Sequence, residues 1–428
     1  MWGALAGPLT ILLIATRLTK VEQGYYYTFS SLLALQVFFE LGLLTVLAQF
    51  AAHEFAFLSW GEKGEITGSE AHRDRFIDLL GKGFKWYSVS AILLVFALIP
   101  AGLYFFTQSP ENVVDFIWRL PWALAVIGVG CNLLLIPFYA VITGSGDVAS
   151  INRREMMGGM AGSIIGWLVL ACGGGLYAIP AVTTGTIVVG VVYLFRSKPR
   201  LVATAFSNAF GSQRPTYTIS WWGEVWPMQW KIALSWISGY FIFQLFTPVL
   251  FKFHGPVVAG QMGMTLSAVN AVQGVCIMWF NTRSPEFGKL IALKNWQGLD
   301  TSFNQILKQA MVVCVILSAI AILVITGLQS YTTIGTRFLP VLQVMIFLVA
   351  ACGQVVITGW AIYMRAHKLE PMLVLSIIGA LLAGASTFFL GMKFSSMGVA
   401  VGYSLLTMLY GVPSTYVCLK RFKEHCQI

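Results

Sequence analysis

Glu40 is the clearest ionisable residue in an apolar setting in this chain. It lies inside the apolar stretch 38–43, and Gln36 precedes it by about one helical turn, so a helix would place both side chains on one face. A charged group at the centre of a membrane helix costs roughly 2.5–3.5 kcal/mol on insertion scales. The carboxyl group could therefore bind a proton, a coupling cation or a sugar hydroxyl in a lumen. The alternative is a carboxyl group that is hydrogen-bonded inside a helix bundle and orients its neighbours.

Basic residues near predicted helix ends form a second group of candidates. Lys231, preceded by Gln229, lies about one turn inside an apolar segment, and Arg17, Lys20 and Arg283 lie near the ends of others. Cations at these positions could contact an anionic group of a substrate. Lysine and arginine near helix ends also extend to the lipid headgroups, which is the alternative for all four.

Amide and proline residues complete the candidate set. Asn270 and Gln273 share a polar face that either lines a cavity or bonds neighbouring helices. Pro8 and Pro248 interrupt corresponding apolar segments of the two halves of the chain, and such pairs point to a moving substrate path. We therefore treat Pro8 and Pro248 as hinge candidates, with static kinks as the alternative.

Membrane-spanning helices must position all of these residues. The composition is 57% hydrophobic and 10% charged, and the mean hydropathy is +0.77, which excludes a soluble globule of 428 residues. Windows of roughly 17–25 apolar residues, enough to cross about 30 Å of hydrocarbon, predict an all-α polytopic membrane protein with about twelve spans. The spans lie near 1–16, 25–52, 86–107, 120–143, 157–172, 176–195, 227–250, 257–280, 305–328, 338–363, 371–391 and 396–418.

The second six spans repeat the first six. The run 141–144, which ends the fourth span, recurs as 356–359, which ends the tenth. A second match, between the second and eighth spans, pairs Ser30 with Ser267 and Gln36 with Gln273. Because six is even, the halves enter the membrane in the same direction, and a substrate path is expected between them. The predicted domains are an N-terminal six-helix lobe (1–195), a cytoplasmic linker (196–226) and a C-terminal six-helix lobe (227–428).

The basic residues report topology. Of the 27 Lys and Arg residues, all but six fall in loops after even-numbered spans or in the C-terminal tail. The positive-inside rule therefore places both termini in the cytoplasm, and the net charge of +10 indicates contact with anionic headgroups rather than nucleic acid. The first span lacks the basic segment and cleavage site of a signal peptide and is kept as a helix, although Met1 lies almost inside it and a start codon further upstream is an alternative.

Cysteine usage and loop lengths argue against a function carried by a soluble domain. The seven cysteines fall in spans or the cytoplasmic tail, so neither a disulfide framework nor a metal site is indicated, and no cofactor is expected. Loops on the outer side do not exceed about 15 residues. Among cytoplasmic segments, the apolar residues near Phe76 and Phe84 alternate with basic ones and predict an amphipathic helix on the inner leaflet.

A short motif carries a family resemblance. Gly24-Tyr25 followed by Glu40-Leu41-Gly42-Leu43 resembles the pattern around the first two spans of polysaccharide and O-antigen flippases of the multidrug/oligosaccharidyl-lipid/polysaccharide exporter superfamily. The resemblance implies two six-helix lobes and transport of an undecaprenyl-diphosphate-linked oligosaccharide across the inner membrane by alternating access. It implies a cationic site for the diphosphate, to which Arg17, Lys20, Lys231 and Arg283 could contribute. Partners would be the lipid-linked substrate, membrane lipids and other glycan-assembly proteins.

Two other functions remain as alternatives. An ion-coupled multidrug antiporter of the same superfamily would favour several buried carboxylates, and Glu40 is the clear one here. A membrane-embedded glycan polymerase or glycosyltransferase usually needs a large outer loop or a carboxylate pair for a metal, and the sequence contains no Asp-x-Asp. We therefore expect a transporter and not an enzyme.

Overall fold

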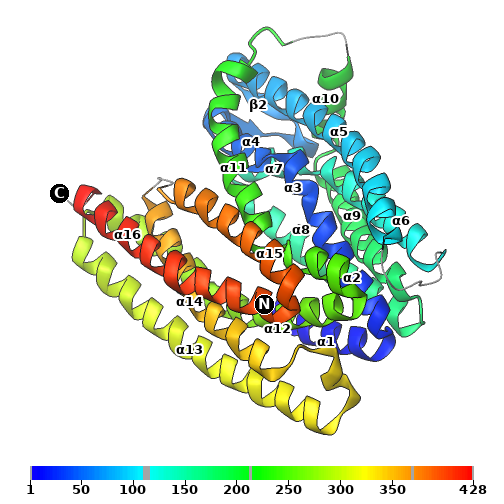
Figure 1. The fold of residues 1–428 in the computed structure, drawn as a ribbon. Helices are drawn as coiled ribbons and strands as arrows, with labels where there is room; N and C mark the ends of the chain where they lie inside the picture. Colours follow the sequence, from blue (N-terminus) through cyan, green and yellow to red (C-terminus); the bar gives the residue numbers. More distant parts are fainter. Residues whose placement is uncertain (1, 109–115, 212–214, 368–370, 427–428) are drawn as a thin grey trace.

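Helices dominate the structure and gather into two lobes. The computed structural model describes residues 2–108, 116–211, 215–367 and 371–426. In Figure 1 the blue, cyan and blue-green helices form the first lobe, and the yellow, orange and red helices form the second, with α12 where the two meet. This arrangement confirms the predicted all-α membrane architecture of two lobes. Among the described residues, seven helices, or eight if a bent pair counts as one span, are long and apolar enough to cross a membrane.

The first lobe holds long helices and one small hairpin. Its elements are α1 (Trp2–Arg17), α2 (Lys20–Leu33), the 3₁₀ turn η1 (Ala34–Gln36), α3 (Val37–Glu40), α4 (Leu43–Phe55), the antiparallel strands β1 (Leu58–Trp60) and β2 (Ile66–Gly68) around the 3₁₀ turn η2 (Glu62–Gly64), α5 (Glu70–Thr107), α6 (Phe116–Leu133), α7 (Ile136–Gly144), α8 (Val148–Ala171), the 3₁₀ turn η3 (Gly175–Tyr177) and α9 (Ala178–Ser197). A capping box opens α2, because the Thr19 hydroxyl accepts the Glu22 amide while the Glu22 carboxylate accepts the Thr19 amide.

The second lobe follows a short connection. That connection contains α10 (Pro199–Phe210) and the π-helical turn η4 (Trp221–Val225), and the lobe contains α11 (Trp226–Phe243), α12 (Phe246–Ala292), α13 (Trp296–Tyr331), the 3₁₀ turn η5 (Thr333–Arg337), α14 (Val341–Ala366), α15 (Leu373–Leu405), the π-helical turn η6 (Leu406–Gly411) and α16 (Val412–Cys426). Non-helical backbone at Gly255 divides α12, and non-helical backbone at Ser395 divides α15. Each of these long elements therefore supplies parts of two predicted spans. The predicted domain limits stay predictions.

Small residues set the spacing of helices inside the first lobe. Gly158, Gly162 and Gly166 recur at every fourth residue of α8, a spacing that predicts a close helix contact, and they face α9. A Cβ atom on Gly162 would lie 2.7 Å from the carbonyl oxygen of Val182, closer than real contacts allow. The two helices therefore approach each other closely at Gly162, because only glycine fits there.

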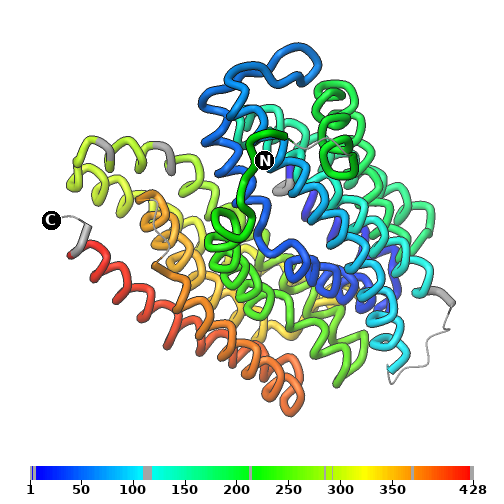
Figure 2. Tube along the Cα trace, turned by 90° about the horizontal axis from the view of Figure 1, so that it is seen from above, coloured from blue at the N-terminus to red at the C-terminus, as the bar shows by residue number. Residues whose placement is uncertain are grey.

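The lobes contact each other mainly through α2 and α12, and they spread apart toward the ends that carry α10 and α16 (Figures 1 and 2). A Cβ atom on Gly24 of α2 would lie 1.9 Å from the carbonyl oxygen of Pro256, and one on Gly263 of α12 would lie 2.2 Å from the ring of Tyr27. The two backbones therefore meet at a distance that only glycine permits.

Hydrogen bonds made by Gln23 and Arg337, here called the clasp, join the two lobes beside the contact between α2 and α12. The Gln23 amide, which is 2% exposed, donates to the carbonyl oxygens of Gly260 at 2.8 Å and Arg337 at 3.1 Å. The Arg337 guanidinium donates in turn to Gln23 Oε1 at 3.2 Å and to the carbonyl oxygen of Leu18 at 2.7 Å. The charge pattern predicts that this end is the outer one, so the lobes are joined there and separated at the predicted cytoplasmic end.

The connection between the lobes is bonded to the first lobe. Residues 215–225, here called the strap, lie along α5: the Ile219 amide donates to the Asp78 carboxylate at 2.7 Å, and Arg75 donates to the Glu224 carboxylate at 2.7 Å. Ile219 is buried beneath this contact. The strap therefore fixes the start of the second lobe's first helix to α5.

One predicted surface helix has a different role. The segment that contains Phe76 and Phe84 is the first part of α5, and both rings are buried instead of lying on the membrane. The prediction was wrong because Phe76 packs against α4 and β1, and Phe84 packs against α7 and α10, contacts that the sequence pattern alone does not reveal.

Candidate functional site

An inter-lobe cavity of about 550 Å³ lies beside the contact between α2 and α12. Its walls come from α2 in the first lobe and from α12, α14 and the junction of α11 with α12 in the second. The lining residues are Tyr27, Ser30, Ser31, Phe243, Gln244, Thr247, Gly263, Leu266, Ser267, Asn270, Gln273, Ile277, Gln354 and Thr358. All of them are neutral, and most offer a hydroxyl or a carboxamide group, so the cavity can form many hydrogen bonds without a charge.

A broken helix brings polar groups into this cavity. α11 ends at Phe243, and α12 begins at Phe246, so Gln244 lies at the break and Thr247 directly follows it. Pro248 explains the break, because a proline has no N–H to donate to the carbonyl four residues earlier. Interrupted helices at membrane depth are tolerated where they line a cavity, and transporter sites commonly use them.

The second interruption lies at the residues of the sequence motif. Leu41 and Gly42 adopt left-handed backbone, with φ of 51° and 65°, and they separate α3 from α4. A Cβ atom on Gly42 would lie 2.5 Å from Ile232 of α11, so this turn also contacts the second lobe. The glycine of the motif is therefore required both by the turn and by the close helix contact.

Glu40 is buried at this turn and does not line the described cavities. It is 4% exposed, and the Tyr87 hydroxyl of α5 donates to its Oε1 at 3.3 Å. Gln36 instead lines a cavity of about 350 Å³ within the first lobe, whose wall includes Ser30. Although the two residues lie one helical turn apart, Gln36 faces α6 and α9 across this cavity, whereas Glu40 contacts α5, so they have different surroundings.

The predicted amide face reaches the inter-lobe cavity, whereas the basic candidates lie apart. Asn270 and Gln273 both line the cavity. Arg283 lines a separate cavity of about 500 Å³ between α12 and α13, where it pairs with Glu286 at 2.6 Å. The roles predicted for these residues stay predictions.

The remaining candidates lie outside the inter-lobe cavity. Arg17 and Lys20 are exposed at the clasp end of the molecule. Lys231 is exposed on α11 with its ammonium 5.8 Å from the ring centre of Trp230, and Gln229 is fully buried with neither amide atom bonded to another described residue. The hinge candidates differ, since α1 continues through Pro8 while a break precedes Pro248.

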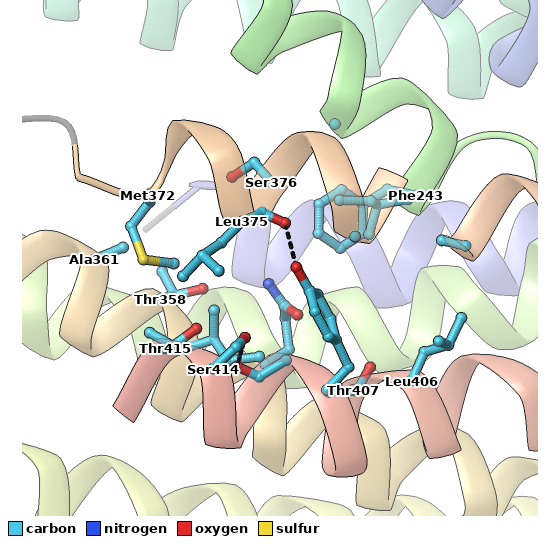
Figure 3. Close-up of a pocket in the computed structure, with 18 of the residues that line it drawn as sticks. Phe243, Thr358, Ala361, Met372, Leu375, Ser376, Leu406, Thr407, Ser414 and Thr415 are labelled. Atoms are coloured by element: carbon cyan, nitrogen blue, oxygen red, sulfur yellow. Dashed lines mark hydrogen bonds between the residues drawn. The ribbon is translucent and has the colours of Figure 1, made fainter. Parts of the chain in front are cut away.

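A second pocket adjoins the cavity within the second lobe. It has a volume of about 280 Å³, lies among α11, α14, α15 and α16, and shares Phe243, Gln354 and Thr358 with the inter-lobe cavity. Figure 3 shows Ser376, Thr407 and other hydroxyl side chains around it, and the dashed line at Leu375 marks its carbonyl oxygen accepting the Tyr410 hydroxyl at 3.1 Å. The π-helical turn η6 forms part of the wall, a feature that is frequent at functional sites.

Several lining residues were not predicted, although the duplication in the sequence contained a signal for them. Ser30 and Ser267, which match across the repeat, both line the inter-lobe cavity. Gln36 and Gln273, another matched pair, line adjoining cavities. Repeat-matched polar residues therefore mark this site better than ionisable residues do.

Comparisons with known proteins support the architecture. The chain matches no protein-family model and no curated protein sequence. Among solved structures, it is similar to a multidrug resistance MATE family transporter of the MOP superfamily in an inward-facing conformation, with a TM-score of 0.56, 14% identity and coverage of 99% of both chains. It is also similar to the lipid II flippase MurJ in an inward closed conformation, with a TM-score of 0.61, 12% identity and coverage of 98% of this chain and 86% of the other.

A third likeness is to the MATE multidrug transporter DinF-BH, with a TM-score of 0.59, 12% identity and coverage of 98% of this chain and 92% of the other. At these identities the likeness establishes the fold. The protein is a multi-pass membrane protein with the two-lobe fold of MOP superfamily transporters.

Proposed function

We propose that the protein carries a lipid-linked oligosaccharide, with undecaprenyl diphosphate as the expected carrier, across the inner membrane by alternating access between the lobes. The neutral, hydrogen-bonding lining of the inter-lobe cavity is the observation that carries this proposal. Sugar hydroxyls need many donors and acceptors, and an organic cation instead favours carboxylates to balance its charge. The flippase motif around Gly42 supports the same substrate class.

In this proposal the glycan enters the cavity and the polyprenyl tail stays in the lipid. Ser30, Asn270 and Gln273 bond the sugars, while Arg17, Lys20, Lys231 and Arg283 are the basic residues available for the diphosphate during entry and release. Glu40 is the proposed coupling group, because a carboxyl group at this depth is costly unless it is protonated or paired. Both termini would lie in the cytoplasm, where other glycan-assembly proteins would meet the transporter.

A multidrug antiporter is the second candidate. Buried Glu40 favours it, since a membrane carboxyl group can exchange a proton for a cationic substrate. The MATE likenesses share the fold to a similar degree as the MurJ likeness, so our preference for the flippase rests on the neutral lining of the cavity.

A leaflet-resolved assay tests the proposal. The purified chain is reconstituted in vesicles with a fluorescent polyprenyl-diphosphate oligosaccharide, and a membrane-impermeant quencher measures how much of it reaches the outer leaflet. Gln273→Leu removes hydrogen bonds to the glycan and should reduce the transport rate by roughly 3- to 10-fold.

Gln108→Leu is the matched control, because Gln108 is exposed at the end of α5 and lines none of the cavities described above. Equal rates in the wild type and in protein-free vesicles would reject the flippase function. Quencher-independent uptake of an organic cation in exchange for protons would favour the antiporter.

A further inference from the structure

Arg154 of α8 is a buried cation with no counter-charge among the residues that the structure describes. It is 6% exposed, and its guanidinium carbon lies 3.9 Å from the centre of the Tyr139 ring of α7. Its Nη2 donates a long hydrogen bond to the carbonyl oxygen of Thr186 at 3.5 Å. Among the described residues no carboxylate pairs with it, and its Nε has no acceptor. Such a cation is costly unless an anion joins it.

A second polar group lies next to it. The Tyr139 hydroxyl is buried, and no described residue bonds it. Gly190 of α9 faces both groups, because a Cβ atom there would lie 2.2 Å from the Tyr139 oxygen and 2.6 Å from Arg154 Nη2. The phenol hydroxyl and the guanidinium therefore both lie against Gly190, where a larger side chain would clash with them.

Arg154 lies near the start of its helix. α8 begins at Val148, so Arg154 lies about 9 Å along it at 1.5 Å per residue. The charge pattern places this end of α8 on the cytoplasmic side. The neighbours Arg153 and Glu155 are exposed on other faces of the helix.

We propose that Arg154 and Tyr139 form a binding site for a phosphate oxyanion. A guanidinium offers its donors in a planar fork that matches phosphate oxygens, and the tyrosine hydroxyl adds a further donor. The phosphate is carried by a lipid headgroup of the cytoplasmic leaflet, by a prenyl diphosphate or by the free ion. The site rests on these contacts alone and does not depend on the substrate of the inter-lobe cavity.

Native mass spectrometry of the purified full chain in detergent tests the site. Four probes separate the sources: short-chain phosphatidic acid, farnesyl diphosphate, inorganic phosphate and a diacylglycerol of matched chain length. Arg154→Gln should weaken phosphatidic acid binding at least about tenfold, and Tyr139→Phe should weaken it roughly 3- to 10-fold. Arg153→Gln, which removes the same charge from the adjacent exposed position, should leave it unchanged.

The outcomes are distinct. Tighter binding of phosphatidic acid or farnesyl diphosphate than of inorganic phosphate assigns the site to a lipid, and the reverse order assigns it to the free ion. Equal binding of phosphatidic acid by the wild type, Arg154→Gln and Tyr139→Phe would overturn the proposal, as would equal binding of diacylglycerol and phosphatidic acid by the wild type. If Arg154→Gln does not fold, Tyr139→Phe decides, because it removes only a hydroxyl that has no partner among the described residues. Phosphate binding at this site and transport in the flippase assay are independent results, since the two experiments test different residues.

Discussion

The contact between α2 and α12 should be broken by a single methyl group at Gly24. In Gly24→Ala the new Cβ atom would lie 1.9 Å from the carbonyl oxygen of Pro256, whereas ordinary contacts begin near 3.4 Å. The helices would have to separate by about 1.5 Å, because the obstacle is backbone and cannot rotate away. Overpacking of this kind costs typically about 1–3 kcal/mol. That cost would shift the equilibrium by about 5- to 150-fold away from the conformation in which α2 and α12 are in contact.

Distance measurements between spin labels test this prediction. Labels at exposed positions on α10 and α16, introduced by Ser207→Cys and Lys420→Cys after replacement of native cysteines, report how far apart the lobes lie at the separated end. Gly24→Ala should move the distribution toward shorter distances as the joined end opens. Gly274→Ala, also in α12, is the control, because its Cβ atom meets nothing within 4 Å. Identical distributions in all three proteins would refute the reasoning.

Two further substitutions have defined outcomes. Glu40→Gln keeps a partner for Tyr87 and removes a costly charge, so protein abundance should be retained while transport in vesicles falls; an equal loss of both would instead indicate a structural role. Arg75→Ala leaves the carboxylate of Glu54, whose side chain is 8% exposed, without the guanidinium that bonds it at 2.8 Å, and should lower the free energy of unfolding by about 1–3 kcal/mol. Thermal unfolding of the purified protein measures this, and Arg73→Ala at the exposed neighbouring position should change it little; similar losses from both would contradict the ion-pair argument.

The membrane fold could be predicted from the sequence because the lipid bilayer imposes it. Apolar segments long enough to cross the bilayer must be helical, and the duplication fixes how two sets of six are related. The glycine ridge near Gly162 was equally predictable, since small residues at helical spacing allow close packing.

The site was less accessible to sequence reasoning because tertiary contacts decide it. Glu40 and Gln36 have different surroundings because α5 packs against the first while α6 and α9 lie across a cavity from the second, which helical spacing alone does not show. Arg154 was counted as a loop cation, since the apolar window predicts a span from 157, whereas α8 begins at Val148. Hydropathy locates the hydrocarbon core and does not show how far a helix extends past it.

The strap makes the two lobes mechanically unequal. Since Ile219 and Glu224 are bonded to α5, the first residues of α11 must travel with the first lobe, although the rest of α11 packs against α15 of the second. Any change in the angle between the lobes must therefore bend or displace α11, because α5 holds only its first residues. Because the helix is interrupted at Gln244, that motion would act on the wall of the inter-lobe cavity.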